Sequence, residues 1–200
     1  TIMIHKITIG IPTYKRSESL REVLKNLVSV YSSNPIFLVL IIDDSTSPAC
    51  ISKNDNLLKE FKDKLPISLH KNKNNLGFAG SFIKLLEHCE TDYMILLADD
   101  DFIVPEHFKE ITSFAVNKNL ALLSPQWVYK DRKRSGRGVS SIRTVKDVEF
   151  RICSGHAPGL ILHVSSYKEE IPRVKDRIDK GCSATITYPL VTFTAGIIAK

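Results

Sequence analysis

The chain has 200 residues, of which 43% are hydrophobic and 25% charged, the balance of a globular protein with its own core. Its net charge of +6 permits nucleic acid, an anionic membrane face or a phosphorylated ligand as partner, but no nucleic-acid motif with interleaved aromatic residues is present. No apolar run reaches the roughly 18 residues of a membrane span and no signal pattern begins the chain, so we expect one compact cytoplasmic domain. The four cysteines are far apart, so we expect their thiols to be reduced.

In chain order, strands alternate with helices. Apolar or β-branched runs predict strands at 6–12, 36–44, 66–72, 92–100 and 120–129. Apolar residues at helical spacing predict helices at 17–31, 54–64, 79–90 and 105–119. Ser19 and Glu22 have the spacing of a capping box in the first helix.

Past residue 130 the alternation stops. The segment 150–170 contains a Gly-rich turn, a short apolar strand and the polar start of a helix. The four earlier repeats predict an α/β fold, with a Rossmann-like, mostly parallel sheet and helices on both faces. We expect a subdomain at 1–130 and a smaller region at 131–200 within one compact domain.

Polar and charged residues follow the predicted strands where each one ends. Asp43 and Asp44 end the second strand, and Asp99, Asp100 and Asp101 end the fourth. Because ligands of open α/β sheets bind outside the carboxyl ends of the strands, we expect these groups to share one rim. Three adjacent carboxylates repel one another, so a positive group is expected beside them.

The other two strand ends supply the remaining candidates on this rim. They are Pro12, Thr13 and Tyr14 after the first strand and Lys71, Asn75 and Gly77 after the third. Adjacent aspartates suit a hard divalent cation, which takes oxygen ligands and bridges them to phosphates. With the basic segment 70–75, such a metal would hold a diphosphate, while Asp43 or Asp44 accepts hydrogen bonds from a base or ribose.

Each of these groups also has a simpler interpretation. The pair Asp43 and Asp44 also fits a polar turn, and the aspartates at 99–101 also fit caps of the next helix. The lysines at 71 and 73 also fit a solvated surface. Their joint occurrence along one rim favours the nucleotide interpretation over these alternatives.

Four segments resemble the nucleotide-binding half of the family 2 glycosyltransferases, which have the GT-A fold. They read "ITIGIPTYKR", "LVLIIDDSTS", "NNLGFAGSF" and "YMILLADDDFIVPEHF", and they lie in the family's order and spacing over about residues 5 to 120. A later segment, "SGHAPGLILH" at 154–163, resembles more loosely the acceptor side of bacterial members that build surface polysaccharides. The resemblance implies an inverting transfer from a nucleotide-diphosphate sugar, with a UDP-sugar favoured, to a glycan or lipid-linked acceptor.

The resemblance also implies roles for the strand-end residues. Thr13 and Tyr14 match residues that flank the nucleotide base, and Asp43, or else Asp44, matches the acidic residue that reads it. The aspartates at 99–101 match the DxD-type motif, in which one aspartate contacts ribose and another holds Mn²⁺ or Mg²⁺. Asp100 aligns best with the metal ligand, and a shift of one residue would bring in Asp101.

Two departures from the family's pattern affect the remaining roles. The helix that begins "FAGSFIKL" lacks the Arg or Asn of many members, so Lys71 or Lys73 would contact the diphosphate instead. The usual "ED" motif of the catalytic base is not recognisable. Candidates for the base are Asp179, Asp176 and His156, of which the histidine also fits a structural role.

Other functions and locations stay open at this point. The chain also fits a nucleotide-binding domain or truncated core without turnover; a sugar nucleotidyltransferase fits less well, because "GIPTYKRSES" has a single Gly where a phosphate loop would be Gly-rich. The basic run "KDRKRSGRG" at 130–138 predicts either a solvated loop or a peripheral contact with the inner face of a membrane.

Overall fold

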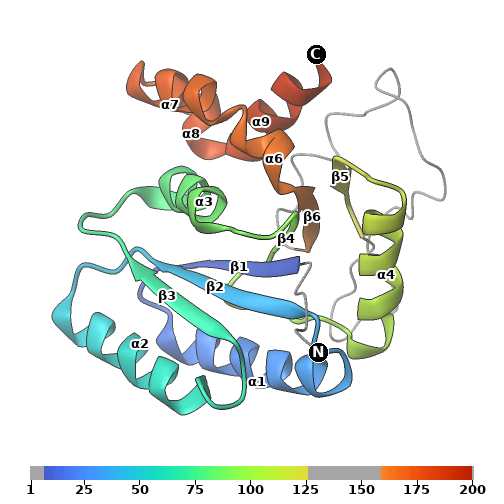
Figure 1. Ribbon diagram of the computed structural model, residues 1–200. Coiled ribbons are helices and arrows are strands. Elements are labelled where there is room, and N and C mark those ends of the chain that lie inside the picture. The colour runs from blue at the N-terminus through green and yellow to red at the C-terminus, as the bar shows by residue number, and fades with distance from the viewer. Residues whose placement is uncertain (1–6, 126–158, 200) are drawn as a thin grey trace, which may run out of the picture.

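A six-stranded sheet forms the centre of the part of the chain that the computed structural model describes, residues 7–125 and 159–199 (Figure 1). The strands are β1 (Ile7–Thr13), β2 (Phe37–Asp43), β3 (Ile67–Lys71), β4 (Tyr93–Leu96), β5 (Leu122–Leu123) and β6 (Leu160–His163), in the order β3-β2-β1-β4-β6-β5. The first four are parallel, whereas β6 runs antiparallel to both β4 and β5. The α/β class and the mostly parallel sheet are therefore confirmed.

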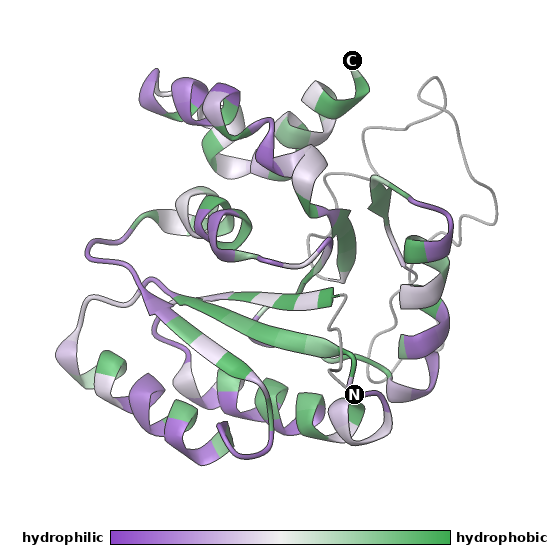
Figure 2. Cartoon of the chain, in the orientation of Figure 1, coloured by the Kyte–Doolittle hydropathy of each residue, from purple (hydrophilic) through white to green (hydrophobic). Residues whose placement is uncertain are grey.

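Helices cover both faces of the sheet, as the alternation predicts. They are α1 (Ser17–Ser33), α2 (Pro48–Phe61), α3 (Gly77–His88), α4 (Pro105–Asn117), α6 (Val164–Lys168), α7 (Ile171–Asp179), α8 (Ser183–Thr187) and α9 (Pro189–Ile198). One apolar cluster joins the sheet to α1, α2 and α4, and a second joins it to α3, α6, α7 and α9. Apolar residues accordingly concentrate along the strands, whereas α7 is mostly hydrophilic (Figure 2).

Several element boundaries differ from the prediction. The capping box is wrong: α1 begins at Ser17 with Arg16 at its N-cap, and no side chain caps it. Helix α2 begins at Pro48 rather than at 54, because proline is favoured in the first turn of a helix, where its missing N–H has no partner to lose. Helix α3 begins at Gly77 rather than at 79.

The strands also differ in length from the predicted runs. β4 ends at Leu96 rather than at 100, and β5 comprises only Leu122–Leu123 among the described residues of the predicted 120–129 run. β1 passes through Pro12, where the run was expected to stop, and continues to Thr13. Proline is tolerated there because the pairing with β4 already ends at Gly10, while the pairing with β2 continues to Thr13.

The C-terminal part of the chain shares the central sheet. β6 lies between β4 and β5, and α6 to α9 follow it over the face that α3 covers (Figure 1). The division at residue 130 stays a prediction, as do the properties of the basic run at 130–138, which lies outside the described residues. Within the described residues, no helix has the length and hydrophobicity needed to cross a membrane.

Candidate functional site

The sheet order brings three strand ends together at one rim. β1 lies between β2 and β4, and all three run in the same direction. The backbone N–H of Asp44 donates to the carbonyl oxygen of Thr13 at 2.9 Å, and the backbone N–H of Lys15 donates to the Ser45 hydroxyl at 2.9 Å. The loops that follow β1 and β2 are thereby held against each other.

Asp99 is a buried carboxylate of this rim, 5% exposed. The Thr13 hydroxyl donates to its Oδ2 at 2.7 Å, and the Arg16 Nη1 lies 3.0 Å from its Oδ1. Burial raises the pKa of the Asp99 carboxyl above its ordinary value, although the Thr13 hydrogen bond and the Arg16 charge act in the opposite direction. Thr13 and Arg16 therefore favour the ionised form of Asp99 against the effect of burial.

Asp100 is the accessible carboxylate. Its side chain is 48% exposed, and Arg16, also 48% exposed, pairs with its Oδ2. Arg16 is thus the positive group expected beside the three aspartates, although the sequence alone does not identify which residue it is. The sequence offered one indication: Arg16 lies three residues after Thr13, in the loop that follows β1. That β1 is the neighbour of β4 is known only from the structure.

Asp43, at 0% exposure, is enclosed by its own loop. Its Oδ1 accepts a hydrogen bond from the Ser45 backbone N–H at 2.9 Å, and its Oδ2 accepts one from the Asn54 amide at 2.7 Å. Asn54, on α2, was not foreseen in the sequence. Its Oδ1 is buried and has no hydrogen-bond partner within the described residues.

Asp44 organises the loop between β3 and α3. Its Oδ1 accepts hydrogen bonds from the Asn72 amide and the Leu76 N–H, both at 2.8 Å, and its Oδ2 accepts one from the Gly77 N–H at 2.8 Å. The Asn75 side chain also accepts from the Gly77 N–H, at 2.9 Å. Gly77 has φ +67°, a backbone conformation that glycine adopts without strain. The Asp44 carboxylate therefore stabilises a turn that the glycine allows.

Two further residues predicted to bind the nucleotide sugar lie at the edge of the rim. Tyr14 is 41% exposed, and the Lys15 ammonium lies 4.8 Å from the centroid of its ring. The Lys15 hydrogen bond lowers the pKa of the Tyr14 hydroxyl. The Lys71 side chain contacts α2, where its Nζ donates a hydrogen bond to Asp55 at 2.7 Å.

The candidates for a catalytic base are far along the chain from these strand ends. Asp176 and Asp179 lie on α7, and Asp176 accepts a hydrogen bond from Lys180 at 2.8 Å, one turn further along the chain. Asp179 is the last residue of the helix. His156 lies outside the described residues.

The strand-end carboxylates fit a divalent metal by the chemistry of their donor atoms. Mn²⁺ and Mg²⁺ prefer carboxylate oxygens, and Asp100 presents a half-exposed carboxylate beside Asp101. In the described part of the chain, no three His, Cys, Asp or Glu side chains are already gathered in the manner of a closed metal site. An open site that a substrate diphosphate completes is the arrangement these residues fit.

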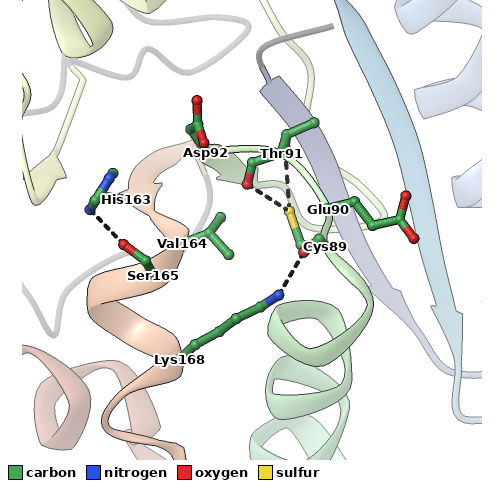
Figure 3. A pocket seen from close by; sticks show the side chains of 8 residues that line it. All are labelled: Cys89, Glu90, Thr91, Asp92, His163, Val164, Ser165 and Lys168. Carbon is green, nitrogen blue, oxygen red and sulfur yellow. Dashed lines mark hydrogen bonds between the residues drawn. The ribbon is translucent and has the colours of Figure 1, made fainter.

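A small pocket lies away from this rim, beside the amino end of β4. Residues 89–92 and 163–165 together with Lys168 line its volume of about 170 Å³ (Figure 3). Lys168 donates to the Cys89 carbonyl at 2.8 Å, and the Cys89 thiol lies 3.4 Å from the Thr91 hydroxyl. Lys168, Cys89 and Thr91 thus already contact one another, and none of the predicted site residues lines this pocket.

Comparison with known families gives one match that covers most of the chain. The model of glycosyl transferase family 2 matches residues 8–173. An uncharacterized glycosyltransferase of Haemophilus influenzae is 30% identical over 95 residues, which are 48% of this chain and 34% of that protein. Poly(ribitol-phosphate) beta-N-acetylglucosaminyltransferase TarS of Staphylococcus aureus is 22% identical over 135 residues, 67% of this chain and 22% of that protein.

Solved structures show the same fold. A crystal structure of S. aureus TarS 1-349 in complex with UDP-GlcNAc has a TM-score of 0.66 at 20% identity, over 83% of this chain and 47% of that one. The mannosyltransferase PcManGT of Pyrobaculum calidifontis, in complex with GDP-Man and Mn²⁺, has a TM-score of 0.59 at 12% identity, over 84% and 47%. The chain spans about a third or less of the curated relatives and about half of these two structures.

Proposed function

Because this chain belongs to glycosyl transferase family 2, we propose that it transfers a sugar from a nucleotide-diphosphate donor to a glycan or lipid-linked acceptor. The observation that carries the proposal is the meeting of Asp99 and Asp100 with Thr13 and Arg16 at the carboxyl rim of the sheet. Open α/β sheets bind ligands at this rim. A role in bacterial surface-polysaccharide synthesis, on the cytoplasmic side of the membrane, belongs to the same proposal.

The donor nucleotide would lie across the loops after β1 and β2. Tyr14 is exposed beside Asn75 and has an aromatic face for the base, while Asp43 and Asp44 fix the loops around it. Among structures with this fold, TarS has been solved with UDP-GlcNAc and PcManGT with GDP-Man. Of the two nucleosides in these complexes, uridine and guanosine, we propose uridine, so that the donor is a UDP-sugar.

The diphosphate and a divalent metal would lie beside Asp100 and Asp101. When bound, Mn²⁺ or Mg²⁺ would offset the negative charge that builds on the leaving nucleoside diphosphate. Asp99 is buried against Thr13 and Arg16, so its part is to hold the strand end or to contact ribose. The transfer would be an inverting displacement, with Asp179, Asp176 or His156 taking the proton of the acceptor hydroxyl.

Calorimetric titration of nucleotides tests this proposal directly. UDP, GDP, CDP and dTDP are each titrated into the protein, once with Mn²⁺ and once with EDTA. We expect one nucleotide to bind, in a metal-dependent way, and Asp100→Asn to abolish the metal dependence because it removes a charged oxygen ligand. The matched control is Asp63→Asn, an exposed aspartate on the turn after α2.

The outcomes separate the proposal from its alternatives. No binding of any nucleotide by the folded protein would contradict it. Metal-dependent binding without consumption of the matching nucleotide sugar, in the presence of lipid-linked acceptors, would favour a nucleotide-binding domain without turnover. Binding that is equal with Mn²⁺ and with EDTA would exclude the metal assigned to Asp100.

A further inference from the structure

We propose that Arg16 is the resident cation of the strand-end carboxylates: it stays with Asp99 and releases Asp100 to the divalent metal. Guanidinium and metal would then compete for the same carboxylate. The inference rests on the proposed function, because it assumes that a metal binds at Asp100. It goes further by assigning a role to a residue that the donor-binding prediction does not include.

The two ion pairs of Arg16 differ in burial. The side chain of Asp99 is 6% exposed, whereas those of Asp100 and Arg16 are each 48% exposed. An exposed ion pair contributes little to stability, but a buried carboxylate that loses its partner is strongly destabilising. When another cation approaches, the pair with Asp100 is therefore the one that opens.

Asp99 is already satisfied without a metal. Its Oδ2 accepts the Thr13 hydroxyl at 2.7 Å, and its Oδ1 lies 3.0 Å from the Arg16 Nη1. Thr13 is itself 3% exposed, so solvent does not readily replace this hydrogen bond. The arrangement separates the neighbouring aspartates into one that anchors Arg16 and one that remains accessible.

Competition also follows from the charges. A divalent cation on Asp100 would lie beside the guanidinium, and two positive groups on one carboxylate repel each other. Removing Arg16 leaves Asp99 and Asp100 with a more negative potential and without the guanidinium that would compete with the metal. Metal binding should therefore become tighter in its absence, whereas a residue that merely supported the site would weaken binding when removed.

The test measures Mn²⁺ binding without nucleotide, by electron paramagnetic resonance of the free ion in low-salt buffer. We expect Arg16→Ala to bind Mn²⁺ about fivefold more tightly than the wild type, the effect of losing an exposed ion pair of about 1 kcal/mol. Arg16→Lys keeps the charge but loses the forked geometry, so its affinity should lie between the two. Arg21→Ala is the matched control, because Arg21 forms an ion pair with Glu60 between α1 and α2.

Each outcome decides the inference. Unchanged or weaker Mn²⁺ binding by a folded Arg16→Ala protein, or an equal gain in Arg21→Ala, overturns it. If Arg16→Ala does not fold by circular dichroism, Arg16→Lys decides, and an affinity at or below the wild type overturns it. A wild type that binds neither Mn²⁺ nor nucleotide overturns this inference together with the proposed function, whereas metal-dependent nucleotide binding without the gain in Arg16→Ala overturns the inference alone.

Discussion

Asp44 shows how a single residue at a strand end determines the shape of the loop opposite. Its carboxylate accepts three hydrogen bonds from the loop after β3 and the first residue of α3, two of them from the backbone N–H groups of Leu76 and Gly77. The side chain is 3% exposed, so water does not replace these bonds when they are lost. The position of Asn75 and the start of α3 therefore depend on a residue of another loop.

Replacing Asp44 with Ala should lower the free energy of unfolding by about 2–3 kcal/mol, because buried backbone donors lose a charged acceptor. Urea denaturation measures this change, with Asp63→Ala as the exposed control, for which we expect a change within about 0.5 kcal/mol. Equal stability of the two variants would contradict a structural role for the Asp44 carboxylate.

Cys182 differs from the other described cysteines in its chemical environment. The Thr185 hydroxyl donates to its sulfur at 3.3 Å and Arg177 lies 3.4 Å from it. Hydrogen bonds from Thr185, followed by the Arg177 guanidinium, lower the pKa of the Cys182 thiol to about 7. A substantial fraction is therefore thiolate at neutral pH, unlike an ordinary cysteine.

Alkylation by iodoacetamide at pH 7.5 should modify Cys182 before Cys50 and Cys89, because the thiolate is the nucleophile. Peptide mass spectrometry after timed quenching measures the order. The rate at Cys182 should fall as the pH drops below 7, and Arg177→Ala should slow it. Labelling of Cys50 at the same rate would contradict the assigned environment.

At the scale of elements, an ion-pair cluster connects α7 to α3. Glu87 of α3 accepts hydrogen bonds from Lys175 of α7 and from Lys84 of its own helix, each at 2.7 Å. Burial alone would raise the pKa of the Glu87 carboxyl, but the two lysines lower it below its ordinary value. The ionised Glu87 carboxylate thus connects α7, which is mostly hydrophilic, to α3, which begins at the candidate site.

Glu87→Gln should lower stability at neutral pH by up to about 1 kcal/mol, the range of partly exposed ion pairs. A lowered folded-state pKa of Glu87 means that this stability is present above the unfolded pKa of about 4.3 and is lost as the pH falls through the folded pKa. Thermal unfolding of both proteins between pH 3 and pH 7 checks the sign. A stability difference that grows on acidification would contradict it.

At the scale of the whole molecule, strand order determines which loops meet. β1 and β4 are neighbours although their paired residues Ile7 and Tyr93 are 86 positions apart in the chain. This pairing places the loop that contains Arg16 beside Asp99 and Asp100. β6 then pairs on the other side of β4, so the C-terminal helices share the core that supports the rim.

Local pattern was sufficient for much of this architecture. The apolar runs and helical spacings identify the alternating elements, and the rule that ligands bind at strand ends identifies Thr13, Asp44 and Asp99 as neighbours of one rim. Element ends were less well predicted: α2 starts earlier than its apolar periodicity, and β4 stops before the aspartates. Periodicity records which face is buried, whereas an end depends on proline placement and on where a neighbouring strand stops.

The sequence by itself determined the class of fold, the alternation of strands and helices from β1 to β5 and the acidic strand ends, because each of these depends on residues close together in the chain. Only the tertiary structure decided that Arg16 is the cation beside Asp99 and Asp100, that Asn54 and Asn72 hold the neighbouring carboxylates, and that Lys71 pairs with Asp55. These contacts join different loops, and their geometry follows from strand order and packing, which no local period specifies.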